Sequence, residues 1–138
     1  MHIYLIGSLR NPVIPELGRT LRTWGHTVFD DWFGAGPKAD DSWQEYETVR
    51  GRSYKEALKG LAAEHTFEWD LKHIREADAG VLVLPAGKSA HLELGYMIGR
   101  GQRGYVFMPE MPKRWDLMYR LAHGVYHTMG DLEKGLSK

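Results

Sequence analysis

Residues 79–101 have the sequence AGVLVLPAGKSAHLELGYMIGRG, and this stretch indicates the fold class of the whole chain. The run at 81–84 is short, continuous and apolar, which is typical of a strand buried on both faces of a parallel sheet. Pro85 and Gly87 interrupt this run, and Ser89 is a suitable N-cap for a following helix. We therefore expect a strand, a loop of small residues and a helix in this order.

The expected helix carries an acidic residue close to its start. Leu92, Tyr96 and Gly99 fall on one stripe for packing, and Gly95 and Gly99 would allow close approach of another backbone. Glu93 falls within about the first turn, where the helix dipole favours an ionised carboxylate by ~0.3–1 kcal/mol. Glu93 therefore either offsets the dipole or belongs to a functional site.

The composition is that of an ordinary globular protein without a charge bias. The chain has 138 residues, of which 43% are hydrophobic and 26% are charged. Eighteen basic residues balance eighteen acidic ones, so we expect neither nucleic acid nor an anionic membrane as a partner. The lack of cysteine excludes disulfides and thiolate metal sites, and it fits a reducing cytoplasm. The start, MHIYLIG, is typical of a strand, so we expect no signal peptide and no membrane span.

Strand and helix signals alternate along the rest of the chain. We expect strands at 2–6, 26–29, 104–108 and 125–126, and helices at 15–24, 65–77, 114–122 and 131–135. Residues 43–63 also have a helical pattern, with breaks near Gly51 and Gly60, whereas residues 33–42 have the composition of a loop. The alternation predicts a single α/β domain over residues 1–138, with a flavodoxin-like or Rossmann-like doubly wound parallel sheet of four or five strands.

A doubly wound sheet binds its ligand at the carboxyl ends of the strands where the winding direction reverses. In this chain those ends are the loops 7–10 and 85–89. The first loop, GSLR, offers backbone N–H groups, a hydroxyl and the guanidinium of Arg10, which suit a phosphate or carboxylate. An ordinary strand-to-helix turn with a surface arginine is the alternative. The topology places Arg10 and Glu93 at the same crevice.

A second carboxylate lies within the helix expected at 65–77. Asp70 stands at the edge of the apolar face, where the low helix propensity of aspartate requires a reason. That reason is either a functional site or an ion pair with a neighbour such as Lys72 or His73. The seven histidines are scattered without metal-binding spacing, so we expect no metal and no other cofactor. His91, two residues before Glu93, either faces the pocket or is a solvated residue at the helix start.

The segment 30–43 combines acidic and aromatic residues. Carboxylates can bind sugar hydroxyls and tryptophan can stack on a base, whereas turn formation explains the Asp and Gly content equally well. The segment is therefore either a flap over the site or a set of turns. The acidic and aromatic residues that would form such a flap are Asp30, Asp31, Trp32, Asp40, Asp41 and Trp43.

Four motifs, spread over most of the chain, together resemble the nucleoside 2-deoxyribosyltransferase superfamily, including its branch of 2'-deoxynucleoside 5'-phosphate N-hydrolases. Residues 4–10, YLIGSLR, are similar to the opening Tyr-x-x-Gly-Ser-Ile-Arg of the hydrolases. Residues 70–78 are similar to the helix that carries the catalytic aspartate. Residues 93–96, ELGY, followed by Gly101, match the segment with the nucleophilic glutamate. Residues 116–118, DLM, are similar to the Asn-Leu-Met that the transferases lend to a neighbouring subunit.

The resemblance implies cleavage of the N-glycosidic bond of a (deoxy)ribonucleoside 5'-monophosphate, with release of the free base. Glu93 would attack the anomeric carbon through an oxocarbenium-like transition state. Tyr4 would orient that carboxylate by a hydrogen bond, and Asp70 would help to protonate the leaving base. The implied partner is thus a small-molecule nucleoside or nucleotide.

The resemblance also implies the substrate-binding residues and an assembly. Gly87 stands where the transferases have an aspartate and the hydrolases a phosphate-binding serine, and Lys88 and Ser89 could replace the missing groups. The segment around Asp116, which replaces an asparagine, implies a homodimer or a higher homo-oligomer. The implied substrate-binding residues are Gly7, Ser8, Leu9, Arg10, Gly87, Lys88, Ser89, His91, Asp116 and Met118.

Three other functions fit the same residues. A nucleoside 2-deoxyribosyltransferase would pass the sugar to a second base instead of to water. A non-catalytic nucleotide-binding module would bind without releasing base, and an enzyme of related fold would cleave the nicotinamide bond of NAD. The sequence leaves the base, the sugar and the state of the 5' group open.

Overall fold

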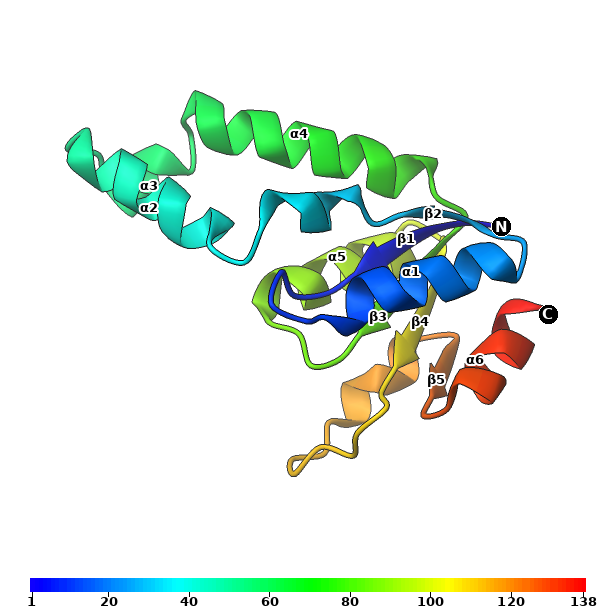
Figure 1. Cartoon of the computed structure of the whole chain (residues 1–138). Helices are drawn as coiled ribbons and strands as arrows, with labels where there is room; N and C mark the ends of the chain where they lie inside the picture. Colours follow the sequence, from blue (N-terminus) through cyan, green and yellow to red (C-terminus); the bar gives the residue numbers. More distant parts are fainter.

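Five parallel strands form one sheet, and the computed structural model describes all residues from 1 to 138. The strands are β1 (His2–Ile6), β2 (Thr27–Phe29), β3 (Ala79–Val83), β4 (Arg103–Phe107) and β5 (Gly124–Tyr126). Their order in the sheet is β2-β1-β3-β4-β5, and all four neighbouring pairs are parallel (Figure 1). This order confirms the predicted flavodoxin-like sheet, in which the winding direction reverses between β1 and β3.

Six α-helices and two 3₁₀ helices connect and flank the strands. The α-helices are α1 (Val13–Thr23), α2 (Ala39–Val49), α3 (Tyr54–Ala57), α4 (Leu61–Glu76), α5 (Lys88–Gly99) and α6 (Met129–Leu136). The 3₁₀ helices are η1 (Asp31–Ala35) and η2 (Leu117–Leu121). None of these helices combines the length and the apolar character that crossing a membrane requires.

Side chains of the central strands alternate between two apolar cores, because successive residues of a strand point to opposite faces of the sheet. In β1, Ile3 and Leu5 enter the core formed with α1 and α6. Tyr4 and Ile6 enter the core formed with α4 and α5 on the other face. The position of Tyr4 in β1 therefore directs its ring towards the helices that carry the two candidate carboxylates.

Glycines in the strands allow α5 to approach the sheet closely. A Cβ atom on Gly80 would lie 2.6 Å from the Sδ atom of Met97, and one on Gly104 would clash with other side chains of α5. A Cβ atom on Gly95 or Gly99 would meet no atom within 4 Å. The prediction that Gly95 and Gly99 provide the close approach is therefore wrong.

The buried stripe of α5 also differs from the predicted one. Ala90, Leu94 and Met97 face the sheet, whereas Leu92 is 75% exposed and Tyr96 is 36% exposed. Apolar residues occupy nearly every side of this helix, so hydrophobic spacing alone does not select one face. The space above the strand glycines makes the selection.

The start of α5 corrects two further predictions. Gly87, and not Ser89, is the N-cap residue, and no side chain caps the helix. Ser89 is instead the second residue of the helix. Glu93 consequently lies in the second turn, and the first turn holds no acidic residue. A dipole-offsetting role for Glu93 therefore loses its positional basis, since the effect falls off within the first turn.

Two segments have a different secondary structure from the expected one. Residues 33–42 are largely helical, because η1 ends at Ala35 and α2 begins at Ala39. The helix expected at 114–122 is reduced to η2, because the Asp116 side chain accepts a hydrogen bond from the Met118 N–H at 2.8 Å and starts a short 3₁₀ turn. The breaks predicted near Gly51 and Gly60 are confirmed, since both residues lie outside the helices there.

The segment 39–69, here called the arm, comprises α2, α3 and the first part of α4, and it extends beyond the sheet (Figure 1). Many of its large apolar side chains are exposed, whereas the last turns of α4 pack on β1 and α5. The exposed set is Tyr46, Val49, Tyr54, Leu58, Leu61, Phe67 and Trp69. The arm therefore presents apolar surface that the domain itself does not cover.

Candidate active site at the carboxyl ends of β1 and β3

A cavity of about 550 Å³ opens at the carboxyl ends of β1 and β3, and we call it the sheet-end cavity. It brings together residues from β1, the loop after β1, η1, α2, α4 and α5. Its lining residues are Tyr4, Gly7, Ser8, Leu9, Arg10, Trp32, Ala35, Ala39, Asp40, Thr66, Trp69, Asp70, Gly87, Lys88, Ser89, Ala90 and Glu93. All three predicted catalytic residues and both predicted loops therefore meet in one cavity.

Three residues of the predicted substrate-binding set lie elsewhere. His91, Asp116 and Met118 line a separate cavity of about 230 Å³ between α5 and η2. The His91 Nδ1 atom lies 2.7 Å from the Gly87 carbonyl oxygen, and its Nε2 atom lies 3.0 Å from the Tyr119 hydroxyl. Because a carbonyl only accepts, Nδ1 carries the proton and donates it there. His91 thus ties η2 to the start of α5 within one chain, and it does not face the sheet-end cavity.

Burial dominates the electrostatics of the two carboxyl groups. Burial, and then the charge of Asp70, raises the pKa of Glu93 to about 8. Burial also raises the pKa of Asp70 to about 6, although the nearby His73 opposes the rise. The Oδ1 atom of Asp70 is buried without a hydrogen-bond partner. Between about pH 6 and pH 8 the pair therefore holds one proton, and Glu93 carries it.

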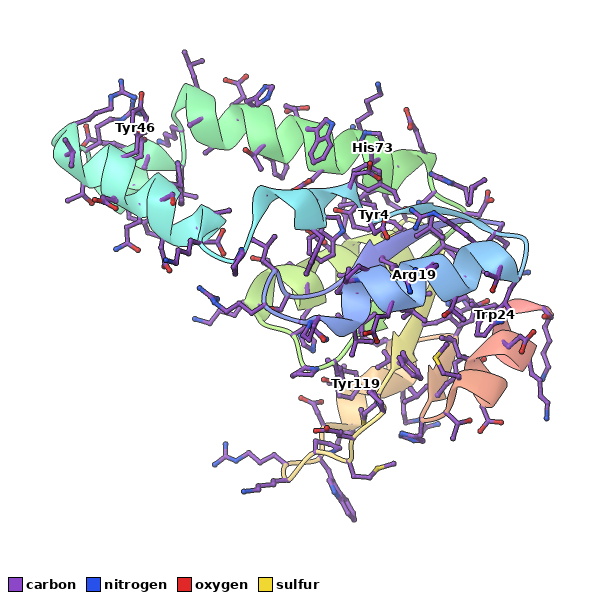
Figure 2. The ribbon with its side chains drawn as sticks, viewed as in Figure 1. Tyr4, Arg19, Trp24, Tyr46, His73 and Tyr119 are labelled. Atoms are coloured by element: carbon purple, nitrogen blue, oxygen red, sulfur yellow. The ribbon has the colours of Figure 1, made fainter.

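Tyr4 is held close to these carboxyls as a neutral phenol. Its side chain is 1% exposed, and burial together with Glu93 and Asp70 raises its pKa. The Tyr4 ring stacks on Phe29 at 5.3 Å between centroids, and Phe29 in turn stacks on His73 at 3.9 Å. Figure 2 shows Tyr4 and His73 in the layer between β1 and α4. The stack fixes the phenol with its O–H available as a donor.

Four residues of the site had not been predicted from the sequence. Thr66 and Trp69 line the sheet-end cavity from α4. Thr66 stands four residues before Asp70 and shares its helix face, a signal that could have found it once the boundaries of α4 were known. Trp69 could not be found in this way, because adjacent residues of a helix do not face each other. The Phe29 and His73 stack had no such signal, since it joins β2 to α4.

The segment 30–43 contributes to the site in part. The Trp32 indole N–H donates to the Leu5 carbonyl at 2.8 Å and anchors η1 above β1. Trp32 and Asp40 line the sheet-end cavity, whereas Trp43 lies deeper in the arm. The segment therefore supplies a helical wall of the site, and Asp40 is the one aspartate of the segment that lines the cavity.

The loop after β1 uses part of its hydrogen-bonding capacity internally. The Ser8 hydroxyl accepts from the Arg10 N–H at 3.1 Å, and the Ser8 carbonyl accepts from the Asn11 N–H at 3.1 Å. Fewer backbone N–H groups are free than the sequence predicted. The Arg10 guanidinium lies 3.5 Å from Asp41, and both side chains are mostly exposed, so this ion pair contributes little. The guanidinium can therefore turn towards a ligand.

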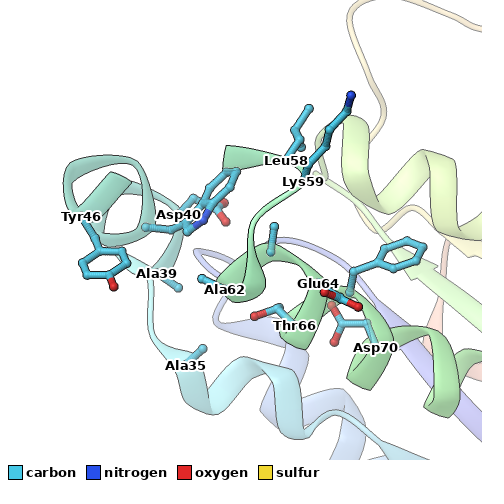
Figure 3. Close-up of a pocket in the computed structure, with 13 residues that line it drawn as sticks. Ala35, Ala39, Asp40, Tyr46, Leu58, Lys59, Ala62, Glu64, Thr66 and Asp70 are labelled. Atoms are coloured by element: carbon cyan, nitrogen blue, oxygen red, sulfur yellow. The ribbon is translucent and has the colours of Figure 1, made fainter. Parts of the chain in front are cut away.

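A second cavity, of about 800 Å³, lies between α2 and α4, and we call it the arm cavity (Figure 3). It shares Ala35, Ala39, Asp40, Thr66 and Asp70 with the sheet-end cavity. Its other lining residues are Trp43, Tyr46, Leu58, Lys59, Ala62, Ala63, Glu64 and Phe67. Asp70 thus stands where the two cavities meet. No group of three or more His, Cys, Asp or Glu side chains in the chain is arranged to hold a metal ion.

Several solved structures share this fold, whereas no protein-family model and no curated protein matches the sequence. A 2-deoxyribosyltransferase from the psychrotolerant bacterium Bacillus psychrosaccharolyticus is 23% identical, with 96% of this chain and 90% of that chain covered and a TM-score of 0.69. The CMP N-glycosidase BcmB of Clostridium botulinum is 14% identical, with both chains covered over 100% and a TM-score of 0.59. A conserved protein from Enterococcus faecalis is 11% identical, with 99% and 97% covered and a TM-score of 0.66. The chain therefore has the fold of these proteins over nearly its whole length.

The raised pKa of Glu93 predicts how stability depends on pH. Between its ordinary value of 4.5 and about 8, the folded protein holds a proton that the unfolded chain has released. The contribution of Glu93 to the free energy of unfolding is therefore largest below about pH 4.5 and decreases as the pH rises to about 8. Glu93→Gln removes this decrease, so the variant should exceed the wild type at pH 8 by on the order of 2–4 kcal/mol.

Urea unfolding at about pH 5 and pH 8 measures this difference. Glu16→Gln, on the exposed side of α1, is the matched control, and its stability should follow the wild type at both pH values. Parallel curves for Glu93→Gln and the wild type would show that Glu93 ionises normally in the folded protein.

Proposed function

We propose that this protein cleaves the N-glycosidic bond of a (deoxy)ribonucleoside 5'-monophosphate and releases the free base. The observation that carries the proposal is the meeting of Glu93, Asp70 and Tyr4 in the sheet-end cavity, where burial shifts the pKa values of all three. Two proteins with the same fold are a 2-deoxyribosyltransferase and a CMP N-glycosidase, which supports chemistry at a nucleoside N-glycosidic bond.

Glu93 acts as the nucleophile in the first step. Its carboxylate forms a bond to the anomeric carbon while the bond from that carbon to the base nitrogen breaks. The electron pair of the broken bond goes to the base, which takes a proton from Asp70. Water then attacks the anomeric carbon as the bond from that carbon to the Glu93 oxygen breaks, and the Asp70 carboxylate takes the proton that the water loses. This step releases the sugar phosphate and restores the Glu93 carboxylate and the Asp70 acid.

The carboxyl pair holds the number of protons that this step requires. The reaction requires one ionised and one protonated carboxyl group, and the pair holds one proton between about pH 6 and pH 8. Without ligand, the proton favours Glu93. Productive binding therefore transfers it to Asp70, and a hydrogen bond from the neutral Tyr4 phenol stabilises the resulting Glu93 carboxylate.

The loops around the cavity supply groups for a 5'-phosphate. Arg10, in the loop after β1, and Lys88, the first residue of α5, both line the sheet-end cavity, and two cations suit a dianion better than a neutral hydroxymethyl group. Gly87 has no atom within 4 Å of the position that a Cβ would occupy, so the start of α5 is open to a bulky group. The N–H groups of the first turn of α5 add donors there.

Base exchange is the alternative reaction. A deoxyribosyltransferase shares the fold, and Gly87 lacks the hydroxyl that the resemblance associates with phosphate binding. In that reaction a second base, and not water, accepts the sugar from Glu93. The first step is the same in both reactions.

Replacement of the nucleophile tests the proposed reaction. Glu93→Gln should reduce the release of free base by several orders of magnitude, because the amide cannot form the glycosyl ester. Turnover is measured by chromatography of free base from a panel of nucleosides and nucleotides, with Glu16→Gln as the control that makes the same substitution at an exposed position. If the variant keeps activity within about tenfold of the wild type, the loss of ~1.4 kcal/mol is too small for removal of a covalent step. That result would contradict the assignment of Glu93 as the nucleophile.

A preference for the phosphorylated substrate should depend on Arg10. We expect 5'-monophosphates to be cleaved faster than the matching nucleosides, and Arg10→Ala to lower kcat/KM for the nucleotides roughly ten- to a hundredfold. This range corresponds to the ~1.5–3 kcal/mol of a charged hydrogen bond. Arg19→Ala, on the exposed side of α1, should change neither rate. Equal wild-type rates for nucleoside and nucleotide would instead favour the transferase.

The working unit is expected to be at least a dimer. Trp115, Met118 and Leu121, in and next to η2, are 92%, 56% and 61% exposed, which is more apolar surface than a free chain normally leaves in one short segment. The resemblance places the equivalent segment in a partner's site. Light scattering at assay concentration should report a dimer or larger species, and a fully active monomer would contradict the prediction.

A further inference from the structure

We propose that the arm cavity is a subsite for a bulky apolar substituent on the leaving base, and that the protein therefore selects bases that carry one. An alkyl or aryl group on an exocyclic nitrogen is the chemical class that fits. The inference rests on the proposed function, because it assigns the substrate of the same site. It concerns the part of the substrate that lies beyond Asp70.

The direction of the substrate follows from which carboxyl lines which cavity. Glu93 lines only the sheet-end cavity, whereas Asp70 lines both. In the proposed reaction Glu93 contacts the anomeric carbon and Asp70 contacts the base. A line from the sugar to the base therefore runs from Glu93 to Asp70, and a substituent on the far side of the base continues into the arm cavity.

The size of the arm cavity exceeds the needs of a bare base. Its volume of about 800 Å³ lies in the range of about 300–1,000 Å³ in which proteins enclose whole drug-sized ligands. The sheet-end cavity already offers about 550 Å³ for the sugar phosphate and the ring next to Asp70. The additional space would remain unused by an unsubstituted purine or pyrimidine.

Small side chains on facing helices create this space. Ala35 and Ala39 line it on one side, and Ala62 and Ala63 line it from α4 (Figure 3 labels three of the four). Methyl groups at these positions leave room that larger side chains would fill. The cavity therefore reflects the small size of the residues on its two sides.

The chemical character of the walls indicates an apolar substituent. Eight of the thirteen lining residues are hydrophobic, and Trp43, Tyr46 and Phe67 supply aromatic surface. Phe67 is 60% exposed in the free protein, so a ligand that covers it gains apolar burial. The carboxylates around the cavity, Glu64 among them, disfavour an anionic group. An aryl or alkyl group matches these properties.

Binding of free bases tests the subsite without requiring turnover. Isothermal calorimetry on the full-length protein compares adenine with 6-benzylaminopurine, which differs by one benzyl group. We expect 6-benzylaminopurine to bind at least tenfold more tightly. Ala62→Trp fills the cavity from an exposed helix position and should abolish this difference. Glu68→Trp places the same side chain elsewhere on α4, outside both cavities, and should preserve the difference.

The outcomes separate this inference from the proposed function. Equal affinity for the two bases, or the same loss in Ala62→Trp and Glu68→Trp, would overturn the subsite. Cleavage of AMP with no preference for its benzylated counterpart would refute the subsite and leave the reaction in place. Selective binding of the benzylated base without cleavage of any nucleotide would support the subsite and refute the reaction. Dissociation of an oligomer by Ala62→Trp, with no change in base selectivity, would assign the cavity to a second copy of the chain.

Discussion

The parallel pairing of β1 with β3 is the constraint on which the rest of the structure depends. Its register, with Tyr4 opposite Gly80 and Ile6 opposite Leu82, brings the carboxyl ends of the two strands together where the winding direction reverses. The loops that follow must then lie side by side, one leading into α1 and the other into α5. The same register directs Tyr4 to the face covered by α4 and α5. A cavity with a phenol at its base follows from this pairing.

The carboxyl pair adds an energetic constraint to the geometric one. Removing Glu93 and Asp70 from water disfavours their charged forms, and neither carboxyl group forms an ion pair that would compensate. The Asp70 Oδ1 atom lacks even a hydrogen bond. Unpaired carboxyl groups at neighbouring buried positions cost stability, so their retention is easier to explain by chemistry than by folding. The two buried carboxyl groups are therefore better explained by an active site than by a structural role.

The arm joins the two cavities. Asp70 directly follows it in α4, and the space between α2 and α4 continues the sheet-end cavity outwards. Within the arm, the buried Glu47 pairs with Arg50 and Arg52 across the turn that follows α2. This local network holds the outer end of the arm together, although the arm makes few contacts with the sheet. The arm cavity is thus built largely by elements outside the central core.

The sequence by itself determined the order of the strands, the parallel α/β fold and the crevice shared by Arg10 and Glu93, because apolar runs and Gly or Pro breaks are local signals and the doubly wound topology has one crevice. The resemblance to a family, and not the pattern, added Tyr4 and Asp70 to the same site. It did not determine which face of α5 is buried, since apolar residues surround that helix and only the space above Gly80 and Gly104 selects a side. The tertiary structure alone turned His91 towards Tyr119, placed Phe29 and His73 behind Tyr4, and raised the pKa of Glu93 to about 8. Each of these depends on atoms that are distant in sequence and close only after folding, which is why no local pattern could reveal them.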